Sequence, residues 1–129
     1  MLFRSYFTSI GGVPAHSIAR WNGSNWSAMG SGVNGPVYSL AVLPNGHVIA
    51  GGHFSSAGGV PANNIARWNG TTWSALGSGV GSPYDGEWVF ALAVLPNGDV
   101  IAGGRWLYDE SCVVRWNGTM WSAMGSPGH

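Results

Sequence analysis

The chain has 129 residues, of which 45% are hydrophobic and only 8% are charged, and its formal net charge is zero. This length suits one ordinary domain. Five arginines, no lysine and five acidic residues give no basic surface, which excludes nucleic acid as the expected partner because phosphate binding requires one. No polybasic patch or long apolar run indicates membrane insertion.

A tryptophan-marked unit recurs along the chain and covers most of it. Its copies are IARWNGSNWSAMGSG (18–32), IARWNGTTWSALGSG (65–79) and VVRWNGTMWSAMGS (113–126). A second stretch, SLAVLPNGHVIAGG (39–52), recurs as ALAVLPNGDVIAGG (91–104). The steps of 47 to 52 residues are typical of propellers and repeat arrays. The repetition therefore indicates repeated architecture rather than three copies of a reaction centre.

Each unit predicts short extended elements in a fixed order. VYSLAVL (37–43) is almost all apolar, as expected of a strand covered on both faces, and PNG then turns the chain into HVIAGG (47–52). After a glycine-rich connection, NNIARW (63–68) predicts a third strand. Asn69-Gly70 predicts a type I′ hairpin turn into TTWSALG (71–77). The pattern predicts four antiparallel strands per unit.

These residues resemble the kelch-like β-propeller repeat, in which a strand ending in a glycine pair and a tryptophan-bearing fourth strand recur. The repeated sequence is similar to repeats of secreted bacterial proteins and to the propeller domain of fungal cortical cell-polarity marker proteins. It departs from the kelch pattern where Trp-Asn replaces the usual Tyr-Asp of the third strand. The residues that carry the repeat are Trp21, Trp26, Trp68, Trp73, Trp116, Trp121, Gly51, Gly52, Gly103 and Gly104.

The resemblance implies an all-β fold: a partial β-propeller of about three four-stranded antiparallel blades, forming a single segment over 1–129. Blade one (1–31) is expected to lack its innermost strand, whereas blade two (36–79) and blade three (88–126) are complete. Propellers usually close with about 4–8 blades. We therefore expect further blades, supplied either by a longer chain or by a homo-oligomer.

The variable loops of the third unit are the candidate binding site, because loops can change without disturbing a scaffold. VGSPYDGEWVFA replaces the shorter VNGPVYS of the second unit, and RWLYDESC shortens another connection. Aromatic rings beside carboxylates suit a sugar or a peptide, although solvated loop charge and packing would also explain them. The candidate ligand-binding residues are Tyr84, Asp85, Glu87, Trp88, Arg105, Trp106, Tyr108, Asp109 and Glu110.

Other signals are assigned to structure rather than to chemistry. His16, His47, His53 and Cys112 have no regular ligand spacing, so no metal and no cofactor is expected. Arg20, Arg67 and Arg115 each precede a tryptophan, which suggests a cation–π ladder between blades. The glycosylation sequons at Asn22, Asn25, Asn69 and Asn117 arise mostly from the repeated turn.

The sequence thus favours a non-enzymatic interaction module that binds a protein or carbohydrate ligand through its variable loop face. No catalytic residue is assigned, because the predicted inner strands carry few polar groups and no nucleophile motif is present. A fragment of a propeller-scaffold hydrolase or oxidase is the alternative. The resemblance implies an extracellular or cell-surface location, although MLFRSYFTSI at the start does not match a signal peptide.

Overall fold

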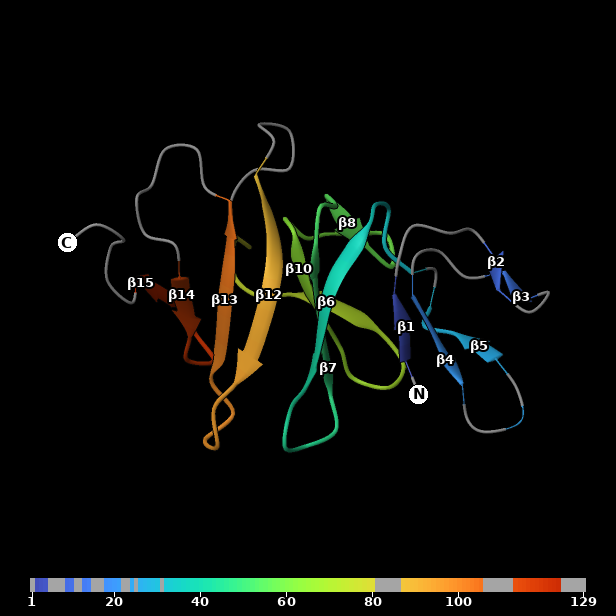
Figure 1. Cartoon of the computed structure of the whole chain (residues 1–129), viewed down its shortest axis with the longest axis horizontal. Helices are drawn as coiled ribbons and strands as arrows, with labels where there is room; N and C mark the ends of the chain where they lie inside the picture. Colours follow the sequence, from blue (N-terminus) through green and yellow to red (C-terminus); the bar gives the residue numbers. More distant parts are fainter. Residues whose placement is uncertain are drawn as a thin grey trace.

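The computed structural model consists of three main antiparallel β-sheets that follow one another along the chain (Figure 1). It describes residues 2–4, 9–10, 13–14, 18–21, 24, 26–30, 32–80, 87–105 and 113–123. These residues form strands and turns but no helix, and so no helix able to cross a membrane. The all-β class predicted from the sequence is confirmed.

The second and third sheets each have four antiparallel strands, as predicted. The second sheet contains β6 (Val37–Val42), β7 (Val48–Gly52), β10 (Ile65–Trp68) and β11 (Trp73–Ala75). The third sheet contains β12 (Trp88–Val94), β13 (Val100–Arg105), β14 (Val113–Trp116) and β15 (Trp121–Ala123). The tight turns at 43–47 and 95–99 lie at one end of the sheets, hereafter the turn end, and the opposite end is the loop end (Figure 1).

The first sheet has three strands among the described residues, in the order β1-β4-β5. They are β1 (Leu2–Arg4), β4 (Ile18–Trp21) and β5 (Trp26–Ala28). Arg4 lies opposite Ile18 in the same register as Gly51 lies opposite Ile65 in the second sheet. The strand β1 therefore corresponds to β7, the second strand of the unit, and no described strand of the first sheet corresponds to β6.

Two short hairpins lie where the sequence predicts only a glycine-rich connection. They pair β2 (Ser9–Ile10) with β3 (Val13–Pro14), and β8 (Ser56–Ala57) with β9 (Val60–Pro61). In the second hairpin, Gly58 and Gly59 have φ of 58° and 80°. Positive φ at both central positions is the requirement of a type I′ turn, which the Gly-Gly pair meets.

The turn between β10 and β11 differs from the type I′ turn predicted for Asn69-Gly70, and that prediction is wrong. Only Gly70 of this pair has a positive φ, 107°. The Asn69 Oδ1 atom accepts hydrogen bonds from the N–H groups of Thr71 and Thr72 at 2.9 and 2.8 Å. The asparagine is needed as an acceptor that closes a wider loop, not for its tolerance of positive φ.

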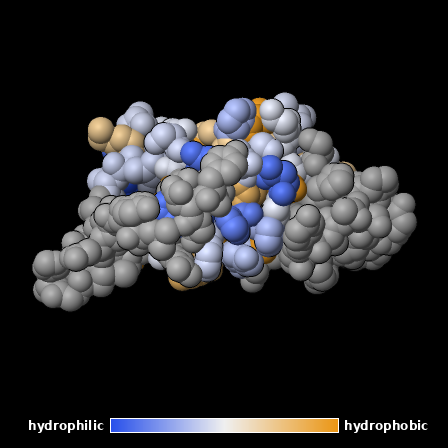
Figure 2. All heavy atoms as spheres, turned by 90° about the horizontal axis from the view of Figure 1, so that it is seen from above, coloured by the Kyte–Doolittle hydropathy of each residue, from blue (hydrophilic) through white to orange (hydrophobic). Residues whose placement is uncertain are grey.

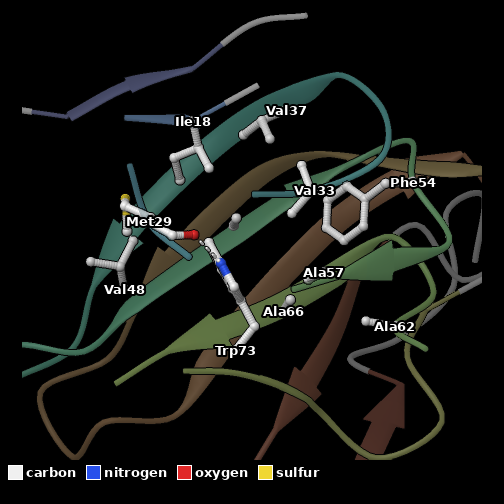
Figure 3. Close-up of a cluster of buried hydrophobic side chains, with 11 residues drawn as sticks. Ile18, Met29, Val33, Val37, Val48, Phe54, Ala57, Ala62, Ala66 and Trp73 are labelled. Atoms are coloured by element: carbon white, nitrogen blue, oxygen red, sulfur yellow. Dashed lines mark hydrogen bonds between the residues drawn. The ribbon is translucent and has the colours of Figure 1, made fainter. Parts of the chain in front are cut away.

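Two apolar cores lie between consecutive sheets, so the second sheet is covered on both faces. The first core contains Ile18, Met29, Val33, Val37, Val48, Ala50, Phe54, Ala57, Ala62, Ala66 and Trp73 (Figure 3). The second core contains Leu43, Ile49, Ile65, Leu76, Val80, Val89, Val100 and Ala102. Apolar burial between the sheets is therefore the main force that stacks them.

The first strands of the two complete sheets, β6 and β12, are less covered than expected. Val42 is 56% exposed and Phe90 is 53% exposed, whereas every residue of β7 is buried. Both β6 and β12 lie at the edge of their sheets, with one paired neighbour each, and β7 lies between two strands. The apolar composition of VYSLAVL thus does not mean that both of its faces are buried.

A tryptophan side chain fastens each complete sheet to the unit before it. The Nε1 atom of Trp73 donates to the carbonyl oxygen of Met29 at 2.6 Å (Figure 3), and Trp121 donates to Leu76 at 2.9 Å. Met29 and Leu76 each follow the last strand of their own unit. The same contact occurs twice, so these tryptophans are part of the stacking geometry as well as fillers of apolar space.

The residue after each accepting carbonyl is a glycine with positive φ, and a tryptophan ring packs against it. Gly30 has φ of 64°, and a Cβ atom there would lie 3.1 Å from Cζ3 of Trp68. Gly77 has φ of 60°, and its Cβ atom would lie 3.0 Å from Cζ3 of Trp116. Glycine is required at these positions both for the turn and for the approach of the ring.

Replacing Trp73 by Phe tests the indole hydrogen bond. The substitution keeps an aromatic ring in the core but removes the shorter of two hydrogen bonds to the carbonyl of Met29, a residue 2% exposed, and leaves only the bond from the N–H of Gly32 at 3.2 Å. We expect the free energy of unfolding to fall by about 1–3 kcal/mol, measured by urea denaturation. Trp121→Phe should cost less, because Trp121 is only half-buried. Unchanged stability of Trp73→Phe would show that the bond does not hold the sheets together.

Candidate functional site

Three of the nine predicted binding residues lie in the described part of the chain. Trp88 is the first residue of β12 and lies opposite Arg105, the last residue of β13, in the strand register. Glu87 directly precedes Trp88 and is 7% exposed. The other predicted residues, Tyr84, Asp85, Trp106, Tyr108, Asp109 and Glu110, lie outside the described residues.

Both edge strands carry a β-bulge at the same position near the loop end. The register of β6 against β7 shifts between Val37 and Ser39, and that of β12 against β13 shifts between Val89 and Ala91. The residues left out of the pairing are aromatic: Tyr38, which is 36% exposed, and Phe90, which is 53% exposed. A bulge redirects a side chain, and bulges are frequent beside functional sites.

Phe90 belongs to an aromatic group made of His53, Trp88 and Phe90. The ring centroids of His53 and Trp88 are 5.6 Å apart, and those of Trp88 and Phe90 are 6.5 Å apart in an edge-to-face arrangement. Tyr38 occupies on β6 the position of Phe90 on β12, and these strands pack against each other. The group therefore combines a histidine from the second unit with a tryptophan and a phenylalanine from the third.

The loop before β6 fixes the histidine of the aromatic group. The backbone N–H of His53 donates to the carbonyl oxygen of Pro36 at 2.9 Å. A Cβ atom at Gly35 would collide with the backbone carbonyl of His53, so only glycine allows this approach. Asn34 extends the same support, because its Oδ1 atom accepts from the N–H groups of Ser55 and Ser56 at 2.8 and 3.0 Å.

Asn64 is a positioning residue that sequence reasoning missed. It is fully buried and has φ of 67°. Its Nδ2 atom donates to the carbonyl oxygens of Val80 and Glu87, each at 2.9 Å, and its Oδ1 atom accepts from the N–H of Phe54 at 3.2 Å. The amide thus connects the second unit to both residues that flank 81–86, the segment that holds the predicted Tyr84 and Asp85.

Two of the three arginines before the tryptophans, Arg67 and Arg115, make polar contacts within their own sheets. The Arg67 Nε atom donates to Nδ1 of His47 at 2.8 Å, and the Arg115 Nε atom donates to Oδ2 of Asp99 at 2.8 Å. An NH2 nitrogen of Arg115 also lies 2.7 Å from that oxygen. His47 and Asp99 occupy the same place after the PNG turn. These contacts join adjacent strands, a different role from the predicted ladder between blades.

The described residues of the loop end offer aromatic contact surfaces. Among the described residues, no three His, Cys, Asp or Glu side chains gather closely enough to hold a metal ion. Seen from the loop end, the described surface is largely hydrophilic with smaller hydrophobic areas between (Figure 2). Exposed aromatic faces in a polar setting suit stacking on a flat apolar surface such as a sugar ring or an aromatic side chain.

Comparisons of the chain with protein-family models, curated proteins and solved structures give no match. The function must therefore be argued from the site itself.

Replacing Asn64 by Ala tests whether its side chain holds Val80 and Glu87 in place. The substitution removes three hydrogen bonds from a buried site and places alanine at φ of 67°, so we expect a loss of about 3–5 kcal/mol in the free energy of unfolding. Asn64→Gly should cost less because glycine relieves the strain. Asn63→Ala is the matched control, since the half-buried side chain of Asn63 makes one weak hydrogen bond, from Nδ2 to the carbonyl oxygen of Ser78 at 3.3 Å. Equal losses of unfolding free energy in Asn63→Ala and Asn64→Ala would contradict this role of the Asn64 side chain.

Exchanging His47 for Asp tests the in-sheet role of the arginines. The change gives Arg67 the carboxylate partner that Arg115 already has, and we expect a gain of about 0.2–1 kcal/mol at low salt. High salt should reduce the gain, because screening weakens a partly exposed ion pair. Thermal unfolding at two salt concentrations measures it, with Asp99→His as the reverse exchange. A loss of stability in His47→Asp would argue against this pairing.

Proposed function

We propose that the chain is a segment of a kelch-like β-propeller that acts as a non-enzymatic recognition module. Its three sheets would be consecutive blades, and its ligand a carbohydrate or a protein bound at the loop end. The repeated stacking of the sheets through Trp73 and Trp121 supports the propeller arrangement, because the same contact made at each step builds a regular array. The resemblance adds a cell-surface or secreted location to the proposal.

The observation that carries the proposal is the pair of exposed rings at equivalent bulges. Phe90 and Tyr38 expose large aromatic surfaces on strands that are otherwise Val-, Leu- and Ala-rich, and Trp88 and His53 extend that surface. Large exposed aromatic groups are enriched where proteins bind partners. Tyrosine and histidine also carry polar atoms, which can select among ligands that present hydroxyl or amide groups.

The loops predicted from sequence would complete this surface. Trp88 belongs both to the aromatic group and to the predicted loop cluster, and Glu87 stands between Trp88 and the predicted Asp85 in the chain. Carboxylates this close to the rings in the sequence would suit sugar hydroxyls or basic peptide groups.

Array screening followed by matched variants tests the proposed function. The chain is first screened on glycan and peptide arrays, and the strongest binder is then measured by calorimetry. Phe90→Ala should weaken that binder at least about tenfold without changing the unfolding midpoint, because Phe90 is 53% exposed. Met120→Ala is the control, since Met120 is 61% exposed and lies in the turn between β14 and β15. Equal effects of the two substitutions would reject the aromatic group as the site.

A further inference from the structure

In the part of the chain that the structure describes, the first sheet has an unpaired strand edge at a position that is paired in both other sheets. Within the described residues β1 pairs only with β4, whereas its equivalents β7 and β13 each lie between two strands. In the second sheet the position next to β7 is filled by β6, and in the third sheet the position next to β13 is filled by β12. Among the described residues, no strand takes the equivalent position beside β1.

The backbone of β1 directs hydrogen-bonding groups toward that edge. The N–H of Gly52 donates to Asn64 in the direction of β10, so by alternation the N–H of Gly51 points toward β6. Arg4 has the register position of Gly51. Its N–H therefore points away from β4, to the side where a further strand would lie. An open strand edge of this kind is a template for strand addition.

The neighbouring face of the second sheet carries an apolar residue that remains uncovered. Val42 on β6 is 56% exposed, whereas Val94, at the same position on β12, is half-buried against the second core. That core includes Ala41 and Leu43 of β6, so the first strand of one sheet covers the first strand of the next. Since β1 packs near β6, a strand added to β1 would cover Val42 in the same way.

We infer that the edge of β1 and the adjacent face of β6 form a docking site for an extended apolar strand supplied by another polypeptide. The strand would run antiparallel to β1 and carry the pattern V-x-x-L-A-V-L. That pattern is shared by Val37–Leu43 and Val89–Leu95, the strands that fill the equivalent positions. Main-chain hydrogen bonds to β1 would give affinity, and the valines and leucines would give specificity by packing on β6. This site goes beyond the proposed function and does not depend on it.

A peptide with the sequence of 35–46, GPVYSLAVLPNG, is the probe for this site. Labelled at one end and titrated with the chain, it should bind saturably by fluorescence anisotropy, and a scrambled peptide of the same composition should not. In the second sheet the N–H of Leu43 donates to His47 on the side of β7, so the N–H of Ala41 points the same way and that of Val42 points the opposite way.

Two peptides, each carrying one N-methyl group, form a matched pair, because neighbouring N–H groups of a strand point to opposite sides. A methyl group on the nitrogen of the alanine that corresponds to Ala41 should weaken binding at least about tenfold, because it removes one edge hydrogen bond and obstructs the approach. The same group on the next valine should leave binding within about twofold, because that nitrogen faces away from β1. Equal affinity of the two N-methyl peptides would overturn strand addition.

Variants of the chain locate the site on the molecule. Val42→Asp should weaken the peptide about tenfold, since it places a charge on the surface to be covered. Val60→Asp is the control, because Val60 is also exposed, at 39%, but lies on β9, which packs against β11. Thermal unfolding of both variants shows whether each is folded. Absence of saturable peptide binding to the folded chain would overturn the inference.

Discussion

The indole–carbonyl hydrogen bond between consecutive units gives the stacking of the sheets its direction. Apolar burial brings the sheets together but is non-directional, whereas a hydrogen bond from Trp73 to Met29 has one geometry. Backbone hydrogen bonds connect Met29 to the next hairpin: the N–H of Gly32 donates to the carbonyl oxygen of Met29, and the N–H of Gly58 donates to that of Gly32. The hairpin of β8 and β9 is thereby held against the loop that begins β6.

This route explains why the aromatic group draws on two units. His53 comes from the connection after β7, and Trp88 and Phe90 come from β12 of the following unit, so their proximity depends on how the sheets stack. Asn64 reinforces the junction, since its side chain reaches from the second unit to Glu87 at the start of the third sheet. The candidate site is therefore a property of the interface between units, and one isolated unit would not contain it.

The strands could be predicted from the sequence, because apolar runs and glycine-marked turns depend on neighbouring residues alone. The bulges at Tyr38 and Phe90 could not, since a bulge exists only relative to the strand that it pairs with. The role of Asn64 could not be predicted for a similar reason, because its three hydrogen-bond partners lie 10 to 23 residues away in the sequence. The Gly58-Gly59 hairpin, by contrast, had a readable local signal in its glycine pair. The loop cluster was predicted from sequence differences between copies, and only its members Glu87, Trp88 and Arg105 can be placed.

The low charge of the chain follows from its stacking. In the second sheet Ile49 and Ile65 are fully buried because the third sheet covers them. The equivalent residues of the third sheet, Ile101 and Val113, are only half-buried among the described residues. The third sheet thus carries the same apolar residues as the second, although its outer face is less buried among the described residues. A repeat built in this way leaves few positions for charge on its strands, so the polar chemistry that can distinguish ligands is confined to the connections and to the bulged edges of β6 and β12.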